Sequence, residues 1–223
     1  RFIQKENLKK VVIPPAVKRI EFNAFKNCSN IESIEIQSEL ESIGIGAFFG
    51  CSKLTKINIP STIKIIEEAT FYGCSSLENL TIPPSVESIN GRAFYSTKIK
   101  EITIPAKVTN IKEGTFYNCG SLTKLNLPQS LTNIGDNAFY GCSALKKIDI
   151  PKTVKSIGKD VFNNCTSLET IVIPESVKEI GTQMFMNCSS LKTANIQSNI
   201  NKITSSLFSN CKQLVNVSLP STY

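Results

Sequence analysis

Apolar and small residues recur along the chain in a fixed order, best seen between residues 54 and 77. In this stretch they are Leu54, Ile57, Ile59, Pro60, Ile63, Ile66, Thr70, Phe71, Cys74 and Leu77. The set returns every 23 residues, except for one step of 22 residues between Leu77 and Ile99. A short period that holds along the whole chain predicts a solenoid, in which each coil buries its apolar side chains against its neighbours.

The repeat defines the domain organisation. Successive repeats begin at Leu8, Ile31, Leu54, Leu77, Ile99, Leu122, Leu145, Leu168, Leu191 and Leu214. We therefore predict one solenoid over residues 1–223, with about nine 23-residue repeats. Phe2 falls in the phenylalanine column and Tyr223 ends an incomplete coil, so we expect both ends to be truncated and the chain to be part of a longer protein.

Each repeat begins with a predicted strand. Residues 56–59 alternate between polar and β-branched apolar side chains, as a half-buried strand does, and Pro60 then ends the strand because it has no N–H to donate. A second apolar pair, such as Val86 and Ile89, predicts a second extended segment. Pairs such as Ala47 and Phe48 predict a single helical or 3₁₀ turn that closes the coil.

Two local features refine this prediction. Glycines follow the second apolar pair in four repeats, where we expect a change of direction with positive φ. These glycines are Gly44, Gly135, Gly158 and Gly181. Thr97 replaces the usual cysteine in the repeat that is one residue shorter, and we expect a local kink or a tightened turn there.

The eight cysteines all occupy one column of the repeat: Cys28, Cys51, Cys74, Cys119, Cys142, Cys165, Cys188 and Cys211. Side chains in register on stacked coils stay parallel, whereas a disulfide needs converging Cβ atoms. A zinc site needs converging ligands as well, and the chain has no histidine and no Cys-x-x-Cys. We expect free thiols packed as small apolar groups.

Composition excludes several classes of function. The net charge of +7 is dispersed among acidic residues, which argues against nucleic-acid binding, and no run of about 18 apolar residues could insert in a membrane. Without histidine the commonest general base is missing, and neither Gly-x-x-x-x-Gly-Lys nor Gly-x-Gly-x-x-Gly occurs. We predict no enzyme activity and no cofactor. Asn-x-Ser/Thr sequences are weak evidence for export because most arise from the repeat itself.

Two surfaces are candidate binding sites for a protein. The first, the strand face, consists of outward positions of the first strand in each repeat: Lys56, Asn58, Glu78, Asn79, Lys100, Glu101, Thr103, Lys124, Asn126, Lys147 and Asp149. The second, the aromatic edge, follows the core phenylalanine in five consecutive repeats: Phe49, Tyr72, Tyr95, Tyr117 and Tyr140. Solubility is the alternative role for the first surface, and a purely structural ring ladder is the alternative for the second.

The repeat resembles that of the BspA-like leucine-rich-repeat family. The resemblance covers essentially the whole chain and rests on Leu-x-x-Ile-x-Ile-Pro and on Ala-Phe-x-x-Cys, which the repeat from Leu122 to Leu145 matches most closely. It implies a curved, right-handed stack of short parallel strands. It also implies a cell-surface or secreted adhesin that binds host, matrix or other surface proteins. Eight free thiols leave a cytoplasmic scaffold or effector domain as the alternative.

Overall fold

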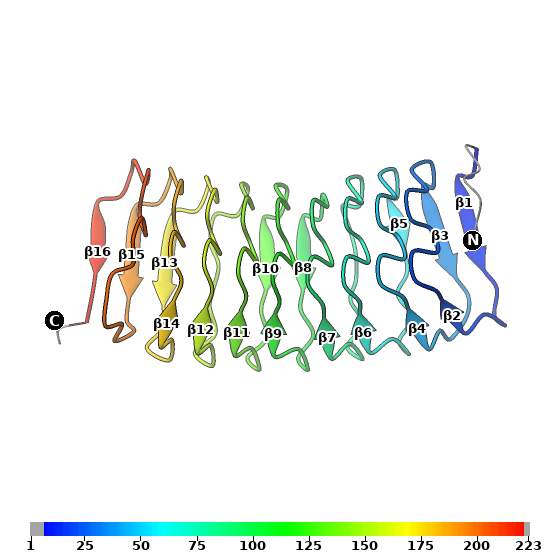
Figure 1. Ribbon diagram of the computed structural model, residues 1–223, viewed down its shortest axis with the longest axis horizontal. Coiled ribbons are helices and arrows are strands. Elements are labelled where there is room, and N and C mark those ends of the chain that lie inside the picture. The colour runs from blue at the N-terminus through cyan, green and yellow to red at the C-terminus, as the bar shows by residue number, and fades with distance from the viewer. Residues whose placement is uncertain (1–6, 221–223) are drawn as a thin grey trace.

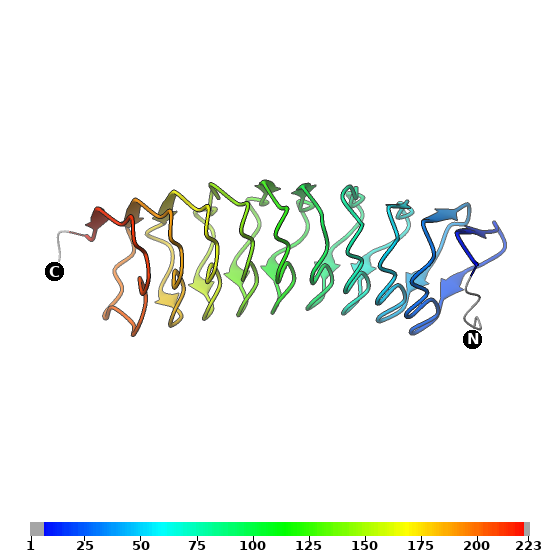
Figure 2. The ribbon, with the colours of Figure 1, turned by 90° about the horizontal axis from the view of Figure 1, so that it is seen from above.

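The computed structural model describes residues 7–220, which form a parallel β-solenoid of about nine coils. Figure 1 shows the coils side by side along one axis, in a shallow arc, with residues 10–13 (β1) and 216–218 (β16) at opposite ends of the stack. Figure 2 shows the same row of coils from above. The predicted solenoid is confirmed. The positions of Phe2 and Tyr223 lie outside the described residues.

The first strand of each coil lies on one side of the stack. These strands are β1 (Lys10–Ile13), β3 (Ser33–Ile36), β5 (Lys56–Ile57), β8 (Glu101–Thr103), β10 (Lys124–Asn126), β13 (Thr170–Ile173), β15 (Thr193–Ile196) and β16 (Asn216–Ser218). They pair in parallel as three sheets, ordered β1-β3-β5, β10-β8 and β13-β15-β16. Paired residues are one repeat apart, as in Ile34 with Ile57.

A second row of two-residue strands lies along another side. These are β2 (Arg19–Ile20), β4 (Ser42–Ile43), β6 (Ile65–Ile66), β7 (Ser88–Ile89), β9 (Asn110–Ile111), β11 (Asn133–Ile134), β12 (Ser156–Ile157) and β14 (Glu179–Ile180). They pair in parallel as β2-β4, β6-β7 and β14-β12-β11-β9. In most of them the second residue, an isoleucine, is buried and the first faces outward.

Proline sets the end of the first strand. In the coil of β5, the N–H of Ile63 donates to the carbonyl of Pro60 at 3.1 Å and closes a turn. Gln37 stands where other coils have proline, and its N–H donates to the carbonyl of Ile13 in the preceding coil at 2.9 Å. The ladder therefore runs one residue further wherever the N–H is present.

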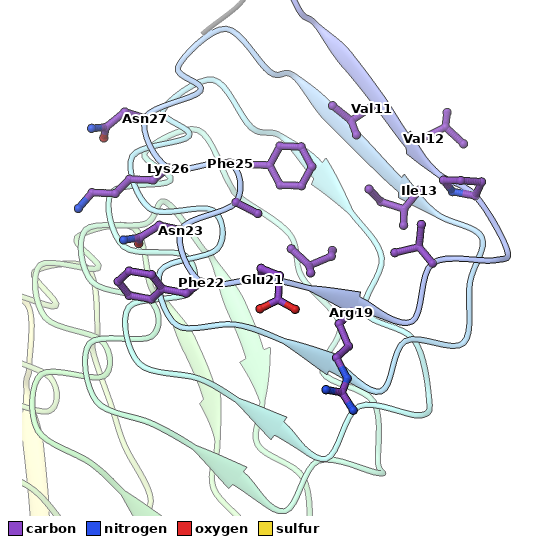
Figure 3. A pocket seen from close by; sticks show the side chains of 14 residues that line it. Val11, Val12, Ile13, Arg19, Glu21, Phe22, Asn23, Phe25, Lys26 and Asn27 are labelled. Atoms are coloured by element: carbon purple, nitrogen blue, oxygen red, sulfur yellow. The ribbon is translucent and has the colours of Figure 1, made fainter. Parts of the chain in front are cut away.

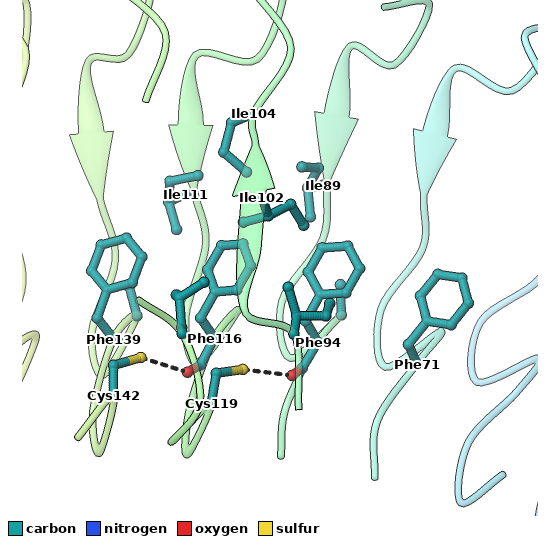
Figure 4. Close-up of a cluster of buried hydrophobic side chains, with 14 of the residues drawn as sticks. Phe71, Ile89, Phe94, Ile102, Ile104, Ile111, Phe116, Cys119, Phe139 and Cys142 are labelled. Carbon is teal, nitrogen blue, oxygen red and sulfur yellow. Dashed lines mark hydrogen bonds between the residues drawn. The ribbon is translucent and has the colours of Figure 1, made fainter. Parts of the chain in front are cut away.

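Phenylalanines form the centre of the core. The rings stack one per coil, with neighbouring centroids 5.3–5.8 Å apart: Phe25, Phe48, Phe71, Phe94, Phe116, Phe139, Phe162, Phe185 and Phe208. All but Phe208 are at most 1% exposed. Figure 4 shows four of these rings with isoleucines packed beside them. Each coil covers the apolar surface that its neighbour would otherwise expose.

The segment that closes each coil is a series of turns. No helix of any kind occurs among residues 7–220, so the single helical or 3₁₀ turn predicted there is replaced by hydrogen-bonded turns. The N–H groups alternate in role. Those of Ala47 and Phe49 donate to carbonyls three residues back, at 3.1 and 3.0 Å, whereas those of Phe48 and Gly50 donate to the next coil, at 3.0 and 2.7 Å.

This alternation depends on two residues with positive φ in each closing segment, four positions apart. In one coil they are Gly46 and Gly50, with φ of 61° and 70°. Elsewhere the same positions hold other residues, including Asn23, Ala69 and Arg92, with φ of 54°, 53° and 56°. Left-handed residues cannot continue a helix of L-amino acids, which is why the segment remains a set of turns.

The prediction of positive φ at the four other glycines is wrong. Gly44, Gly135, Gly158 and Gly181 are absent from the positive-φ residues, although all four are described. Glycine is needed at these positions because the backbone of the preceding coil lies too close to leave room for a side chain. A Cβ on Gly135 would lie 2.8 Å from the backbone nitrogen of Glu113 in the preceding coil, which is too close for any side chain.

The shortened repeat keeps the stack continuous. In the preceding coil, the N–H of Leu77 donates to the carbonyl of Cys74 at 3.0 Å. Thr97 and Ile99, the matching residues, have only one residue between them, and no such bond joins them in the described structure. The repeat with one residue fewer thus lacks this turn. Both Thr97 and Ile99 remain buried, at 2% and 0% exposed.

Candidate functional site

The strand face is a row of outward side chains along the first strands. Lys56 lies on β5, Glu101 and Thr103 lie on β8, and Lys124 and Asn126 lie on β10, all of them exposed. The other predicted residues extend this face. Asn58, Asn79, Lys100, Lys147 and Asp149 are exposed and Glu78 is half-buried. The structure therefore brings the predicted residues together on one continuous side.

Ion pairs link neighbouring coils across this face. The Nζ of Lys100 lies 2.7 Å from Oε2 of Glu78, and the Nζ of Lys124 lies 4.0 Å from Oε2 of Glu101. The hydrogen bond from Lys100, followed by its positive charge, lowers the pKa of Glu78. Exposed pairs of this kind are screened by solvent and contribute little to stability. Their charges remain available to a partner because both members face solvent.

Two asparagines of the face have structural bonds. The side chain of Asn58 accepts from the N–H of Ile36 at 2.8 Å and donates to the carbonyl of the same residue at 2.9 Å. Asn126 donates to Oγ1 of Thr103 at 2.9 Å. In contrast, Lys56 and Asn79 make no side-chain hydrogen bond among residues 7–220. Sequence reasoning could not separate these two groups, because the bonds depend on how adjacent coils lie.

The aromatic edge is a continuous ladder of stacked rings. Neighbouring centroids along Phe49, Tyr72, Tyr95, Tyr117 and Tyr140 are 4.3–4.5 Å apart, with planes within 8° of parallel. All five rings are half-buried. Because each ring covers its neighbour's face, the ladder presents ring edges and hydroxyl groups to solvent.

Polar groups close both ends of this ladder. The Nζ of Lys26 lies 4.9 Å from the centre of the Phe49 ring, a cation–π contact. At the other end, Nδ2 of Asn164 donates to the hydroxyl of Tyr140 at 2.7 Å. Burial and the neighbouring phenols of Tyr72 and Tyr117 raise the pKa of Tyr95 to about 12. Tyr95 is therefore a neutral phenol at physiological pH.

Sequence analysis missed the bonds of the cysteine column. Each thiol from Cys51 onward donates to the carbonyl of the core phenylalanine in the preceding coil, at 3.0–3.2 Å. All eight cysteines are free, and burial raises the pKa of each thiol. Figure 4 shows two of these bonds, from Cys119 to Phe94 and from Cys142 to Phe116. The constant spacing between phenylalanine and cysteine in the repeat could have indicated that each thiol lies near the phenylalanine of the preceding coil.

A hollow lies at the N-terminal end of the stack (Figure 3). Its lining includes the core positions Val11, Val17 and Phe25 together with Arg19 and Glu21. It is the side of the first coil that no other described coil covers. Part of its wall consists of residues that belong to the core, so the hollow continues the core to the end of the described stack.

Residues 7–220 contain neither a metal-binding cluster nor a helix that could span a membrane. In the part of the chain that the structure describes, no group of three or more His, Cys, Asp or Glu residues could hold a metal ion. Over the same residues, no helix has the length and apolar character needed to cross a bilayer.

Comparisons with solved structures identify similar solenoids. A leucine-rich repeat protein from Bacteroides ovatus is 35% identical over 94% of this chain, with a TM-score of 0.82. The chain spans 63% of the length of that protein. A leucine rich repeat protein of T. pallidum is 27% identical, with 83% of this chain and 78% of that chain covered and a TM-score of 0.58.

A third structure, the pneumococcal vaccine antigen PcpA, shares the fold at 24% identity, with a TM-score of 0.58 and coverage of 94% of this chain and 67% of that one. No curated protein shows significant sequence similarity. The sequence profile of the BspA type leucine rich repeat region, which has six copies, matches residues 1–122 and 109–223. These matches span the whole sequence, and the chain therefore belongs to the BspA-type leucine-rich repeat family.

Proposed function

We propose that this chain is a non-catalytic, protein-binding segment of a cell-surface or secreted adhesin that attaches to host or matrix proteins. Family membership, together with an exposed face of varied polar residues on a constant apolar scaffold, supports this proposal. A repeated scaffold presents an extended surface on which many weak contacts add together. The fold itself does not determine the ligand.

The strand face is the surface that we assign to the partner. Its outward residues change in charge from coil to coil while the residues beneath them stay apolar. Among the described residues, Lys56 and Asn79 make no side-chain hydrogen bond, and the ion pairs of Lys100 and Lys124 are exposed. Exposed polar groups of both signs favour a protein partner of mixed charge over a uniformly charged polymer.

Binding to immobilised collagen, laminin and fibronectin tests the role of this face. Lys147→Glu changes the strand face, while Lys155→Glu makes the same charge change in the same coil, just before β12 on the second row of strands. Both lysines are exposed. We expect Lys147→Glu to weaken binding at least about tenfold and Lys155→Glu to leave it nearly unchanged, with equal thermal stability. Equal loss in both variants would exclude a specific role for the strand face.

The alternative is an intracellular scaffold or effector domain, which the eight free thiols favour because reducing compartments preserve thiols. Antibody labelling of intact cells separates the two locations. Labelling without permeabilisation supports surface display. Labelling only after permeabilisation would contradict it.

A further inference from the structure

The tyrosines of the aromatic edge are placed for a reaction with one another. Ring centroids of Tyr72 and Tyr95 are 4.3 Å apart, and those of Tyr95 and Tyr117 and of Tyr117 and Tyr140 are 4.5 Å apart. The planes of these pairs differ by only 8°, 4° and 3°. The rings are nearly parallel and are attached at equivalent positions of successive coils. Equivalent ring carbons of two neighbouring tyrosines are therefore about as far apart as the ring centroids.

Backbone hydrogen bonds hold these coils in register. In each coil, the residue just before the cysteine position donates its N–H to the carbonyl of the tyrosine in the next coil. Gly73 donates to Tyr95 at 2.8 Å, and Ser96 donates to Tyr117 at 2.7 Å. Asn118 donates in the same way to Tyr140 at 2.7 Å. A reaction between neighbouring rings is therefore intramolecular and starts from an aligned geometry, which raises its rate over random encounters.

Other oxidisable groups are scarce or sheltered. The chain has no tryptophan. Six of the eight cysteines are buried, and a thiol reacts mainly as its thiolate, which burial disfavours. Cys165, for example, is fully buried and its pKa is raised to about 12. Cys28, Cys211 and Met186 are half-buried as well, but they belong to coils outside the stretch from Tyr72 to Tyr140. The half-buried tyrosines are therefore accessible targets for removal of one electron.

We propose that the stack from Tyr72 to Tyr140 is a site of oxidative tyrosine cross-linking, which joins neighbouring coils covalently when a peroxidase and hydrogen peroxide act on the protein. Two adjacent phenols each lose one electron and one proton to become phenoxyl radicals. The radicals couple through ring carbons next to the oxygen-bearing carbon and form one C–C bond. Each of these carbons then releases its hydrogen as a proton while each oxygen regains one.

Hydrogen peroxide is the only oxidant that this cross-linking reaction needs. Two phenols become one dityrosine with the loss of two hydrogen atoms, and one hydrogen peroxide accepts them to form two waters. The protons leave at the solvent-exposed edge of the ladder. The product replaces a non-covalent contact between coils with a covalent bond, so that the stack would resist separation under pulling force. This proposal does not depend on the ligand of the strand face.

The experiment treats the folded protein, at low concentration, with horseradish peroxidase and hydrogen peroxide. We expect dityrosine fluorescence in the monomer band and a mass lower by two hydrogens per cross-link. The four tyrosines lie in four different tryptic peptides, because Arg92, Lys98 and Lys124 are among the residues that separate them. Cross-linked peptides therefore identify the pairs directly, and they should join Tyr72 with Tyr95, Tyr95 with Tyr117, or Tyr117 with Tyr140.

Tyr95→Phe provides the matched variant, because it keeps a ring in the stack but removes the phenol. It should abolish the two pairs that include Tyr95 and retain the pair of Tyr117 with Tyr140. Cross-links found only between molecules, or mainly through Tyr223, would overturn the proposal. So would the same pair yields from protein oxidised in denaturant. Each of these failures leaves the adhesion proposal intact, since matrix binding is measured separately on unoxidised protein.

Discussion

The Sγ of Cys119 donates a hydrogen bond to the carbonyl of Phe94 in the preceding coil at 3.0 Å. The same sulfur lies 3.4 Å from Oγ1 of Thr97, the residue that replaces cysteine in that preceding coil. The cysteine column thus supplies donors to seven carbonyls of the phenylalanine column, and Phe71 is passed over because Thr97 replaces the cysteine there. A thiol suits this position because it is small and apolar yet donates weakly.

Thiol reactivity follows from this arrangement. Cys28 and Cys211 are half-buried and the other six are buried, so the two outer thiols should react first with a disulfide reagent such as dithionitrobenzoate. The six inner thiols should react only as the protein unfolds. In denaturant without reductant, all eight should be counted. A lower count would mean that disulfides exist and would contradict the register of the coils.

Alkaline pH should destabilise the fold through the same thiols. Burial raises the pKa of Cys119 to about 11 from the ordinary value of 9.0. The folded protein therefore retains a proton that the unfolded chain loses, so this contribution to stability is complete below pH 9 and declines as pH rises toward 11. We expect Tm to fall between pH 8.5 and pH 10.5, and to fall less in Cys119→Ala, as measured by circular dichroism.

The close approach at Gly135 gives a third prediction. An alanine there would place Cβ 2.8 Å from the backbone nitrogen of Glu113, and backbone atoms cannot move aside cheaply. Gly135→Ala should cost about 1–3 kcal/mol of unfolding free energy. Gly120→Ala is the control, because its Cβ would meet the hydroxyl of the Ser143 side chain at 3.3 Å. Similar urea midpoints for both variants would show that the backbone relaxes.

The sequence predicts the core of this protein well and its turns poorly, for a physical reason. Burial depends on the period of apolar residues, and the columns of Leu54 and Phe71 repeat it without interruption. Backbone φ depends on the path between coils. Ala69 and Arg92 adopt positive φ although neither residue type favours it, while Gly44 does not.

The candidate site shows the same limit. Alternation along the strand places Lys56 and Asn58 on the outer face, and the structure agrees. Alternation does not reveal that the amide of Asn58 binds the backbone of Ile36 in the preceding coil, because that bond depends on contacts between repeats. Nor does it reveal the parallel stacking of the aromatic edge. The aromatic column is visible in the sequence, but the ring orientation is a property of packing.

Relief of backbone strain is a fourth prediction. Ala69 has φ of 53°, a left-handed conformation that costs an ordinary L-residue about 1–2 kcal/mol. Ala69→Gly should therefore stabilise the fold by up to about 1 kcal/mol, after part of the gain is offset by the freer unfolded chain. Ala106→Gly is the control, since Ala106 is exposed and absent from the positive-φ residues. It should destabilise by about 0.5–1 kcal/mol. If chemical unfolding shows that both variants change the unfolding free energy in the same direction, the prediction is wrong.

Substitution of Tyr95 separates the structural and binding roles of the aromatic edge. Its ring is stacked on both sides, against Tyr72 at 4.3 Å and Tyr117 at 4.5 Å. Tyr95→Ser removes both contacts and should cost about 2–4 kcal/mol of stability, whereas Tyr95→Phe keeps the ring and should cost less than about 1 kcal/mol. Thermal unfolding measures the stability of both variants.

The binding assay with immobilised matrix proteins then decides the role of the hydroxyl. If the edge contacts the partner through this hydroxyl, Tyr95→Phe should weaken binding by more than its small loss of stability explains. The ring stays stacked, and only the hydroxyl, which interacts with Tyr72 and Tyr117, has been removed. If the ladder is purely structural, Tyr95→Phe should bind as well as the parent protein, and Tyr95→Ser should lose binding only in proportion to its unfolded fraction. Partner contact is therefore limited to the strand face if the phenylalanine variant binds normally.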